Sequence, residues 1–278
     1  MTDSPREVVE ESVETLDSLV LHATDNGVSW ITLNRPEAMN AVTRDQRERV
    51  ISLLGDASAD PAVRAVVITA TGKGFCAGAD LRSGAVGSTE RVAGDVARTI
   101  RLGAQRLIGA VLDCEKPVIA AVNGTAAGLG AHLALACDLV LAAESAKFIE
   151  VFVRRGLVPD GGGAYLLPRL VGPQRAKELM FFGDSLPAAE AHRMGLVNRV
   201  VPAEELADTA RAWAERLAGG PTRALALTKQ LVNASLDSDR AGAFAAEAAA
   251  QEVNMTTADA NEGVASFVER RTPKYRGL

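Results

Sequence analysis

The sequence contains few cysteines, few aromatic residues and no long apolar segment. Among its 278 residues are three cysteines, and aromatic residues make up 4%. An odd, widely spaced set (Cys76, Cys114 and Cys137) argues against a disulfide framework and favours a reducing compartment, so we expect a cytoplasmic protein with buried thiols. No apolar run is long enough to span a bilayer. Residues 1–18 are acidic and lack the basic and apolar regions of a secretory signal or transit peptide.

Excess positive charge and metal-ligand spacing are also missing. The formal net charge is −5, which gives no reason to expect nucleic acid or an anionic membrane as a partner. The three histidines, His22, His132 and His192, show no ligand spacing with the cysteines. We therefore expect no metal site.

The length and composition fit a soluble globular chain with a sizeable core. Hydrophobic residues make up 47% of it. Residues 1–18 are predicted to be a polar lead-in, residues 19–201 an α/β core, and residues 202–278 a helical region. Within the core, a hairpin around Asp25-Asn26-Gly27 precedes an amphipathic helix from Thr43 to Ala59 and a further strand. This alternation predicts βα units and a largely parallel sheet.

The stretch from Lys116 to Asp138 joins a short buried strand to a helix through glycines. The helix is predicted to begin near Leu129, between Gly128 and Gly130. Backbone N–H groups in the first turn of a helix have no internal partner and attract an anionic oxygen, and glycine lets a ligand approach the backbone. The alternative is a tight strand-to-helix connection that binds nothing.

A second small-residue loop follows another buried strand. Arg64 to Ala70 is the strand, and Thr71 to Arg82 is the loop. Two such loops could direct two N–H groups at one oxygen. A nucleotide-dependent enzyme is disfavoured, because Thr71-Gly-Lys-Gly74 lacks the upstream glycine of a P-loop and Gly128-Leu-Gly130 lacks the third glycine of the dinucleotide fingerprint.

Four ordered motifs resemble the crotonase superfamily of enoyl-CoA hydratases and isomerases: Asn34-Arg-Pro-Glu-Ala-Met-Asn-Ala41, Gly74-Phe-Cys-Ala-Gly-Ala-Asp-Leu81, Ala121-Val-Asn-Gly-Thr-Ala-Ala-Gly128 and Ala191-His-Arg-Met-Gly-Leu-Val197. This resemblance implies the α/β crotonase fold, a spiral of ββα units with a C-terminal helical region that forms trimers, often paired into hexamers. It also implies an acyl-CoA thioester as substrate, with coenzyme A part of the substrate and no separate cofactor.

By the same resemblance, the main-chain N–H groups of Ala79 and Leu129 would hold the thioester oxygen. Donors placed where charge develops on an enolate lower the barrier to its formation. Asp80 is expected to anchor the turn, and Arg82 is either near the CoA phosphates or a solvated loop charge. Residues expected to contact the CoA thioester are Ala77, Asp80, Leu81, Arg82, Phe152 and Lys274, the last from the same or an adjacent subunit.

The acid/base positions differ from those of the hydratases, which resemble one another in carrying two glutamates. This chain has His132 and Phe152 there, and hydration needs a paired acid and base. Asp160 stands instead where several isomerases carry a catalytic aspartate. The segments Ala146 to Asp160 and Asn261 to Lys274 look most like the ring-forming 1,2-epoxyphenylacetyl-CoA isomerases.

Each of these side chains also has a purely structural interpretation. Asp160 could be a helix N-cap, and His132 a packed, hydrogen-bonded core histidine rather than a second acid/base group. Glu150 is interpreted as structural, paired with Arg154 or Arg155.

The sequence therefore predicts an acyl-CoA isomerase that uses Asp160 as catalyst, with His132 as its second candidate. Alternatives are a hydratase that uses His132 in a glutamate's role, and an acyl-CoA binder without catalysis. The segment from Arg82 to Asp95 is expected to be a mobile loop beside the site, and the loop from Ser83 to Arg98 is expected to set part of the shape of the acyl pocket.

Overall fold

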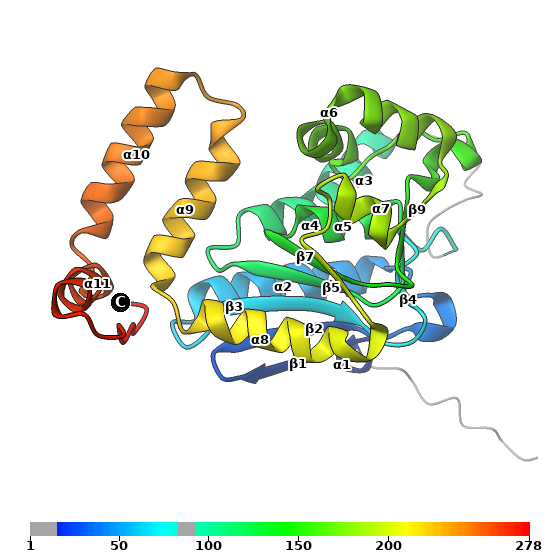
Figure 1. The fold of residues 1–278 in the computed structure, drawn as a ribbon. Helices are drawn as coiled ribbons and strands as arrows, with labels where there is room; N and C mark the ends of the chain where they lie inside the picture. Colours follow the sequence, from blue (N-terminus) through cyan, green and yellow to red (C-terminus); the bar gives the residue numbers. More distant parts are fainter. Residues whose placement is uncertain (1–15, 83–92) are drawn as a thin grey trace, which may run out of the picture.

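The computed structural model describes residues 16–82 and 93–278 and shows two sheets surrounded by helices (Figure 1). The larger sheet has six strands in the order β1 (Val20–Asp25), β2 (Val28–Leu33), β3 (Ala65–Ala70), β5 (Val118–Val122), β7 (Leu139–Ala143) and β10 (Arg199–Val201). The smaller sheet has four strands in the order β4 (Gly74–Cys76), β6 (Thr125–Ala127), β8 (Lys147–Ile149) and β9 (Ser185–Pro187). The predicted α/β class is confirmed.

Strands that follow one another in the chain alternate between the two sheets from β3 to β8. β3, β5 and β7 are parallel neighbours in the larger sheet, and β4, β6 and β8 are parallel neighbours in the smaller one. Each ββ unit therefore contributes one strand to each sheet before the chain continues. This repeated connection places the loops after β4 and β6 side by side, because those two strands pair directly.

The first hairpin and the first long helix begin and end close to where the sequence predicts. β1 and β2 pair antiparallel around Asn26 and Gly27, which both have positive φ, as a tight hairpin turn requires. Helix α2 (Arg44–Ala59) has a capping box: the Thr43 hydroxyl accepts from the Gln46 N–H, and the Gln46 side chain accepts from the Thr43 N–H. Asp60 ends the helix, as predicted.

Helices cover both faces of the larger sheet. On one face, α2, α4 (Ala104–Leu112) and α5 (Leu129–Ala136) pack in the main apolar cluster with residues such as Ile31, Ile68 and Val118. On the other face, α8 (Leu206–Ala218) packs through Leu206 and a row of alanines. All eight residues of α5 are buried, so this helix is fixed on every side.

The remaining helices lie at the edges of the sheets or beyond them: α1 (Leu16–Leu19), α3 (Asp95–Leu102), α6 (Gly163–Phe182), α7 (Ala188–Arg193), α9 (Thr222–Ser235), α10 (Arg240–Asn254) and α11 (Ala258–Glu269). Short 3₁₀ helices are η1 (Pro36–Ala38), η2 (Val151–Arg155) and η3 (Ala203–Glu205). None of the described helices is long and apolar enough to cross a membrane.

The C-terminal helices extend away from the sheets. Figure 1 shows α9, α10 and α11 as a separate arm, with the chain end beside α11. α10 contains no buried residue, and Phe244, Val253 and Phe267 of this arm are exposed. The predicted run of C-terminal helices is confirmed, whereas its predicted role in oligomerisation stays a prediction.

Candidate active site

A cavity lies where the turn after β4, the start of α5 and the segment after β8 meet. Its walls include six of the residues singled out in the sequence: Ala77, Ala79, Leu81, Leu129, Phe152 and Asp160. Five further residues complete it: Gly78, Gly128, Val151, Arg155 and Leu157. The two small-residue loops and the aspartate, which are far apart in sequence, therefore share one cavity.

The Ala79 N–H is directed away from the strand-like segment beside it. Ala79 forms an isolated parallel bridge with Val42. In that bridge Gly78 O accepts from Val42 N (2.8 Å), and Asp80 N donates to Val42 O (2.9 Å). Because successive peptide groups of an extended segment alternate in direction, the N–H of Ala79 points away from Val42, and Ala79 itself lines the cavity. Within residues 16–82 and 93–278 it has no hydrogen-bond acceptor.

The Leu129 N–H is the first backbone donor of α5. Gly128 is the N-cap residue, and its φ of 53° and ψ of −123° suit glycine. The N–H of Leu129 has no intrahelical partner because it lies in the first turn, and none of the other described residues accepts from it. A Cβ added to Gly78 would lie 3.6 Å from this nitrogen. The two loops are thus in direct contact beside the cavity.

Gly128 and Gly130 have different roles, which corrects the expectation that both leave room for a ligand. A Cβ on Gly130 would lie 2.1 Å from the carbonyl oxygen of Cys76, so this glycine allows α5 to pack against the end of β4. Gly128 lines the cavity. The Leu129 side chain is directed at Gly161, since a Cβ there would lie 2.9 Å from Leu129 Cδ1. It is thereby held against the turn that follows Asp160.

Asp160 is half-buried and has no hydrogen-bond donor among the described residues. Burial raises the pKa of its carboxyl above the ordinary value of 3.8, and the charge of His132 offsets this in part. The N-cap interpretation is wrong, because α6 begins at Gly163, its N-cap is Gly162, and no side chain caps it. The N-cap therefore lies two residues later in the chain than this interpretation places it.

His132 lies behind the cavity wall rather than in it. Its side chain is 1% exposed, stacks on Phe152 with ring centroids 5.4 Å apart, and places Nε2 3.0 Å from Glu150 Oε2. The prediction that Glu150 pairs with Arg154 or Arg155 is wrong. After Glu150 the chain turns into η2 instead of continuing as a strand, so the carboxylate is directed into the core and the two arginines are exposed.

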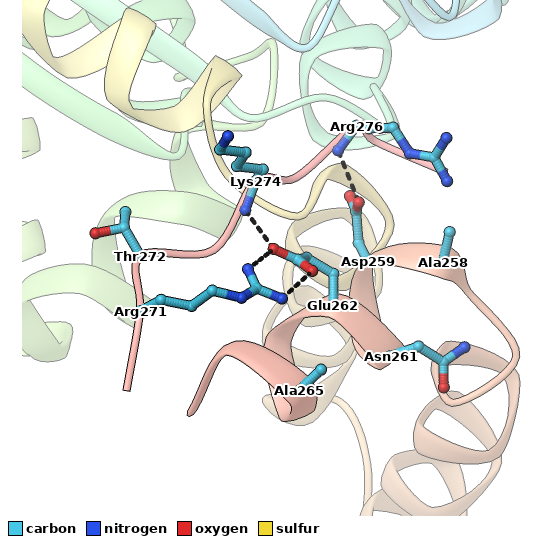
Figure 2. Close-up of a pocket in the computed structure, with 9 residues that line it drawn as sticks. All are labelled: Ala258, Asp259, Asn261, Glu262, Ala265, Arg271, Thr272, Lys274 and Arg276. Carbon is cyan, nitrogen blue, oxygen red and sulfur yellow. Dashed lines mark hydrogen bonds and ion pairs between the residues drawn. The ribbon is translucent and has the colours of Figure 1, made fainter. Parts of the chain in front are cut away.

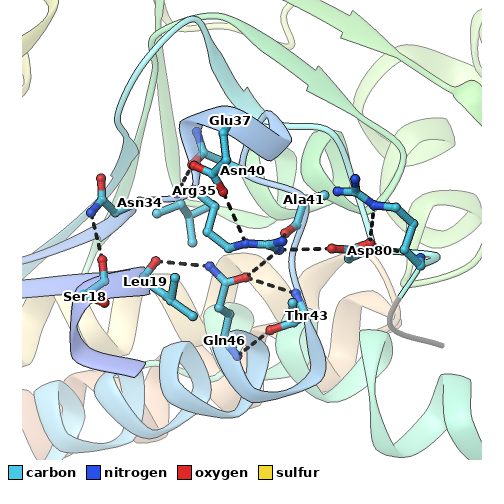
Figure 3. A network of polar contacts seen from close by, with 12 residues as sticks. Ser18, Leu19, Asn34, Arg35, Glu37, Asn40, Ala41, Thr43, Gln46 and Asp80 are labelled. Carbon is cyan, nitrogen blue, oxygen red and sulfur yellow. Dashed lines mark hydrogen bonds and ion pairs between the residues drawn. The ribbon is translucent and has the colours of Figure 1, made fainter. Parts of the chain in front are cut away.

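Asp80 is the anchor of the turn after β4. Its side chain is 5% exposed and accepts hydrogen bonds from Arg35 Nη1 (3.1 Å) and from the Arg82 N–H (3.0 Å). Burial raises its pKa, but these hydrogen bonds and the Arg82 charge outweigh burial and hold the pKa below its ordinary value. Figure 3 shows Arg35 between Asp80, Gln46 and the Ala41 carbonyl. The Arg82 side chain is 76% exposed beside it.

Lys274 lies in a different cavity, with a volume of about 740 Å³, between α11 and the chain end. Figure 2 shows the Arg271 guanidinium and the Lys274 N–H on the Glu262 carboxylate, with the Lys274 side chain directed away. These contacts hold the pKa of Glu262 at about 2. Within one chain, then, the structure does not bring Lys274 to the cavity that holds Asp160.

Three residues of the cavity were missed from the sequence: Val151, Arg155 and Leu157. A signal was present in Gly156, which has a φ of 65° and ends η2 in the left-handed conformation, returning the chain toward the site. Most of the loop expected to shape the pocket, residues 83–92, lies outside the described residues. Among those described, no cluster of three His, Cys, Asp or Glu side chains could hold a metal ion.

Comparison with known proteins finds relatives along almost the whole chain. The family model described as enoyl-CoA hydratase/isomerase matches residues 23–277. The chain is 39% identical to the 1,2-epoxyphenylacetyl-CoA isomerase of Escherichia coli over 93% of this chain and 98% of that protein. It is 38% identical to the crotonyl-CoA hydratase of Syntrophomonas wolfei, over 87% and 92%.

Among solved structures, the enoyl-CoA hydratase/isomerase of Cupriavidus metallidurans superposes with a TM-score of 0.86 at 38% identity, covering 95% of this chain and 98% of that one. The predicted crotonase fold is confirmed. The chain belongs to the enoyl-CoA hydratase/isomerase family, whose members act on acyl-CoA thioesters.

Proposed function

We propose that this protein is an acyl-CoA isomerase that moves a double bond, or rearranges a ring, in a CoA thioester. Asp160 removes a proton from the carbon next to the thioester carbonyl, and the electrons pass to the carbonyl oxygen as an enolate. The same carboxyl returns the proton to a carbon further along the chain, and the carbonyl re-forms. The substrate and product contain the same atoms.

One observation carries the proposal: Asp160 is the only carboxylate among the described residues that line the cavity. A shift of a double bond needs one group that takes a proton and gives it back, whereas addition of water needs an acid and a base together. The raised pKa of Asp160 supports this role, because a stronger base removes a carbon-bound proton more readily.

The enolate oxygen is assigned to the Ala79 and Leu129 amides. Both N–H groups lack acceptors among the described residues, and both residues line the same cavity as Asp160. Because they belong to a buried helix and an anchored turn, they need no rearrangement when charge develops. Ala77, Leu81 and Phe152 supply apolar walls for the acyl group, and Asp80 holds the turn that presents Ala79.

The CoA phosphates are assigned to Arg82 and Lys274. Arg82 follows Leu81, which lines the cavity, and its side chain is exposed. Lys274 lines another cavity of its own chain, so this role requires the chain end of an adjacent subunit. We therefore propose a homotrimer, or a dimer of trimers, assembled through the C-terminal arm. The exposed apolar residues of that arm support this assembly. We also propose that the protein is located in the cytoplasm.

A hydratase that uses His132 is the second candidate, favoured by the similarity to crotonyl-CoA hydratase. The burial of His132 argues against it, because a water attacking an enoyl group must be reached from the cavity, and this side chain is 1% exposed behind Phe152.

A panel of 2-enoyl- and 3-enoyl-CoAs with aliphatic and aromatic acyl groups tests the proposal. We expect double-bond isomers or ring isomers, identified by chromatography and mass spectrometry, to be the main products. Hydroxyacyl-CoA carrying oxygen from labelled water as the main product would establish the hydratase instead. Tight binding without turnover across the panel would identify an acyl-CoA binder.

A further inference from the structure

Glu150 and His132 form a buried pair whose position is fixed from three sides. Nε2 of His132 lies 3.0 and 3.2 Å from the two carboxylate oxygens of Glu150, and the side chains are 1% and 5% exposed. Phe152 stacks on the imidazole with an interplanar angle of 12°. A Cβ on Gly163 would lie 2.2 Å from Nε2, so the backbone of the Gly161–Gly163 turn closes the other side.

The carboxylate determines which imidazole nitrogen carries the proton. An ionised carboxylate only accepts hydrogen bonds, so Nε2 must be the protonated nitrogen. The neutral imidazole then has its lone pair on Nδ1. Nδ1 is buried and has no partner among the described residues. An unmet acceptor in this position is costly unless a donor reaches it during the reaction.

The free nitrogen is directed at the turn that carries Asp160. A Cβ on Gly161, the next residue in the chain, would lie 3.7 Å from Nδ1. Asp160 directly precedes Gly161 and lines the cavity. Glu150 lies at Nε2 and Asp160 lies beyond Gly161, while the exposed Arg155 lines the same cavity as Asp160.

We propose that Glu150 fixes the tautomer of His132 so that Nδ1 accepts a hydrogen bond from Asp160 in its protonated form, between removal of the substrate proton and its return. The inference rests on the proposed role of Asp160. After the carbon–hydrogen bond breaks, the proton is on the Asp160 carboxyl. Its O–H donates to Nδ1 without transferring the proton, which stays available for the receiving carbon. Glu150 and His132 are thus positioning residues, since neither touches the substrate.

Nitrogen-15 NMR of labelled histidine tests the tautomer without any turnover. The chain has three histidines, and His22→Asn and His192→Asn assign the other two. At mildly alkaline pH we expect the imidazole of His132 to carry its proton on Nε2 and its lone pair on Nδ1. An imidazolium, or a proton on Nδ1, would overturn the proposal.

The contact with Asp160 is tested in the same spectra. Asp160→Asn imitates the protonated carboxyl, because its amide N–H can donate to Nδ1, whereas Asp160→Ala has no donor. We expect the Nδ1 resonance to move in the first variant relative to the second. Equal Nδ1 resonances in the two variants would contradict the proposed contact.

Glu150→Gln tests the catalytic consequence. Its amide can donate as well as accept, so Nε2 is no longer held protonated. We expect kcat for isomerisation to fall at least about 10-fold with little change in KM, less than the roughly 10⁴-fold loss when a triad histidine that contacts its nucleophile adopts the wrong tautomer.

Asp138→Asn is the matched control, because it breaks another largely buried ion pair, with Lys229 at 2.9 Å, away from the cavity. A kcat for Glu150→Gln no lower than that of this control would refute the positioning role. Absence of isomerase activity in the wild type would remove the proposed function instead, while the two NMR tests would still decide the inference.

Discussion

Two aspartates near the cavity differ in their hydrogen-bond partners. Asp80 follows the turn at Gly78, and Asp160 precedes the turn at Gly161 and Gly162. Asp80 is buried with hydrogen bonds from Arg35 and Arg82, which lower its pKa. Asp160 has no donor among the described residues, and burial raises its pKa. The difference lies in the neighbours, because a carboxylate that accepts several hydrogen bonds loses its affinity for a proton.

This difference in pKa distinguishes an aspartate with a structural role from one suited to catalysis. Asp80 cannot take a proton without giving up the contacts that hold the turn after β4, so it is suited to structure. Asp160 can take one and become easier to bury, so it is suited to proton transfer. Glu150 is intermediate: it is buried like Asp80, but its partner is an imidazole with one nitrogen still free.

Asp160→Asn should have the largest effect on turnover. The variant keeps the shape of the side chain but cannot accept a carbon-bound proton, and we expect isomerisation to slow by about 10² to 10⁴-fold. Steady-state assays with the best substrate of the panel measure this. Full turnover by the variant would remove Asp160 from the mechanism.

Leu129→Pro should have the next largest effect. Proline is tolerated in the first helical position, but it removes the N–H assigned to the enolate oxygen. We expect kcat to fall about 10² to 10³-fold. Leu129→Ala is the matched control, since it removes the same apolar contacts on Gly161 and keeps the amide. Similar rates in the two variants would show that this amide is not a donor to the enolate.

Asp80→Asn should mainly affect stability. The change leaves the Arg35 guanidinium without its carboxylate, and we expect the free energy of unfolding in urea to fall by about 1–3 kcal/mol at neutral pH. Since the folded pKa of Asp80 is lowered, its stabilisation is present above the unfolded value and is lost as pH falls through the folded value.

In the same unfolding measurement, replacing Asp160 should not lower the free energy of unfolding, in contrast to replacing Asp80. The folded pKa of Asp160 is raised, so its ionisation opposes folding near neutral pH, and Asp160→Asn should be as stable as the wild type or more so. A large loss of stability in Asp160→Asn would remove the contrast between the two aspartates.

The smallest effect we predict is on the pH profile. Only ionised Asp160 can act as the base, so kcat/KM should fall as pH decreases through a pKa above 3.8. Asp80→Asn should reduce stability most at neutral pH, where the wild-type carboxylate is ionised, and should leave this pKa in place. An acid limb that moves with Asp80→Asn would assign the titration to the wrong aspartate.

Much of the fold was predictable because local signals agreed with tertiary packing. The hairpin at Asn26-Gly27, the Thr43 cap and the helix start at Leu129 all rest on interactions within a few residues. The resemblance carried by the four motifs predicted the family, the fold of ββα units and the two loops that line the cavity.

The positions that could not be predicted depend on contacts between distant segments. Glu150 meets His132 across 18 residues only because the chain turns into η2 directly after β8. Gly130 is required by the approach of Cys76, not by a ligand. Capping preference alone favours Asp160 as an N-cap, but the helix begins only at Gly163, with Gly162 as its N-cap, so this alternative to the catalytic role is wrong.

Loss of deuterium from the carbon next to the thioester carbonyl tests the central claim most directly. A 3-enoyl-CoA substrate carrying deuterium at that carbon should lose it from that carbon with wild-type protein, either to the receiving carbon or to solvent. Asp80→Asn should still remove the deuterium, and Asp160→Asn should not. Removal at the same rate by the wild type and by Asp160→Asn would contradict the account.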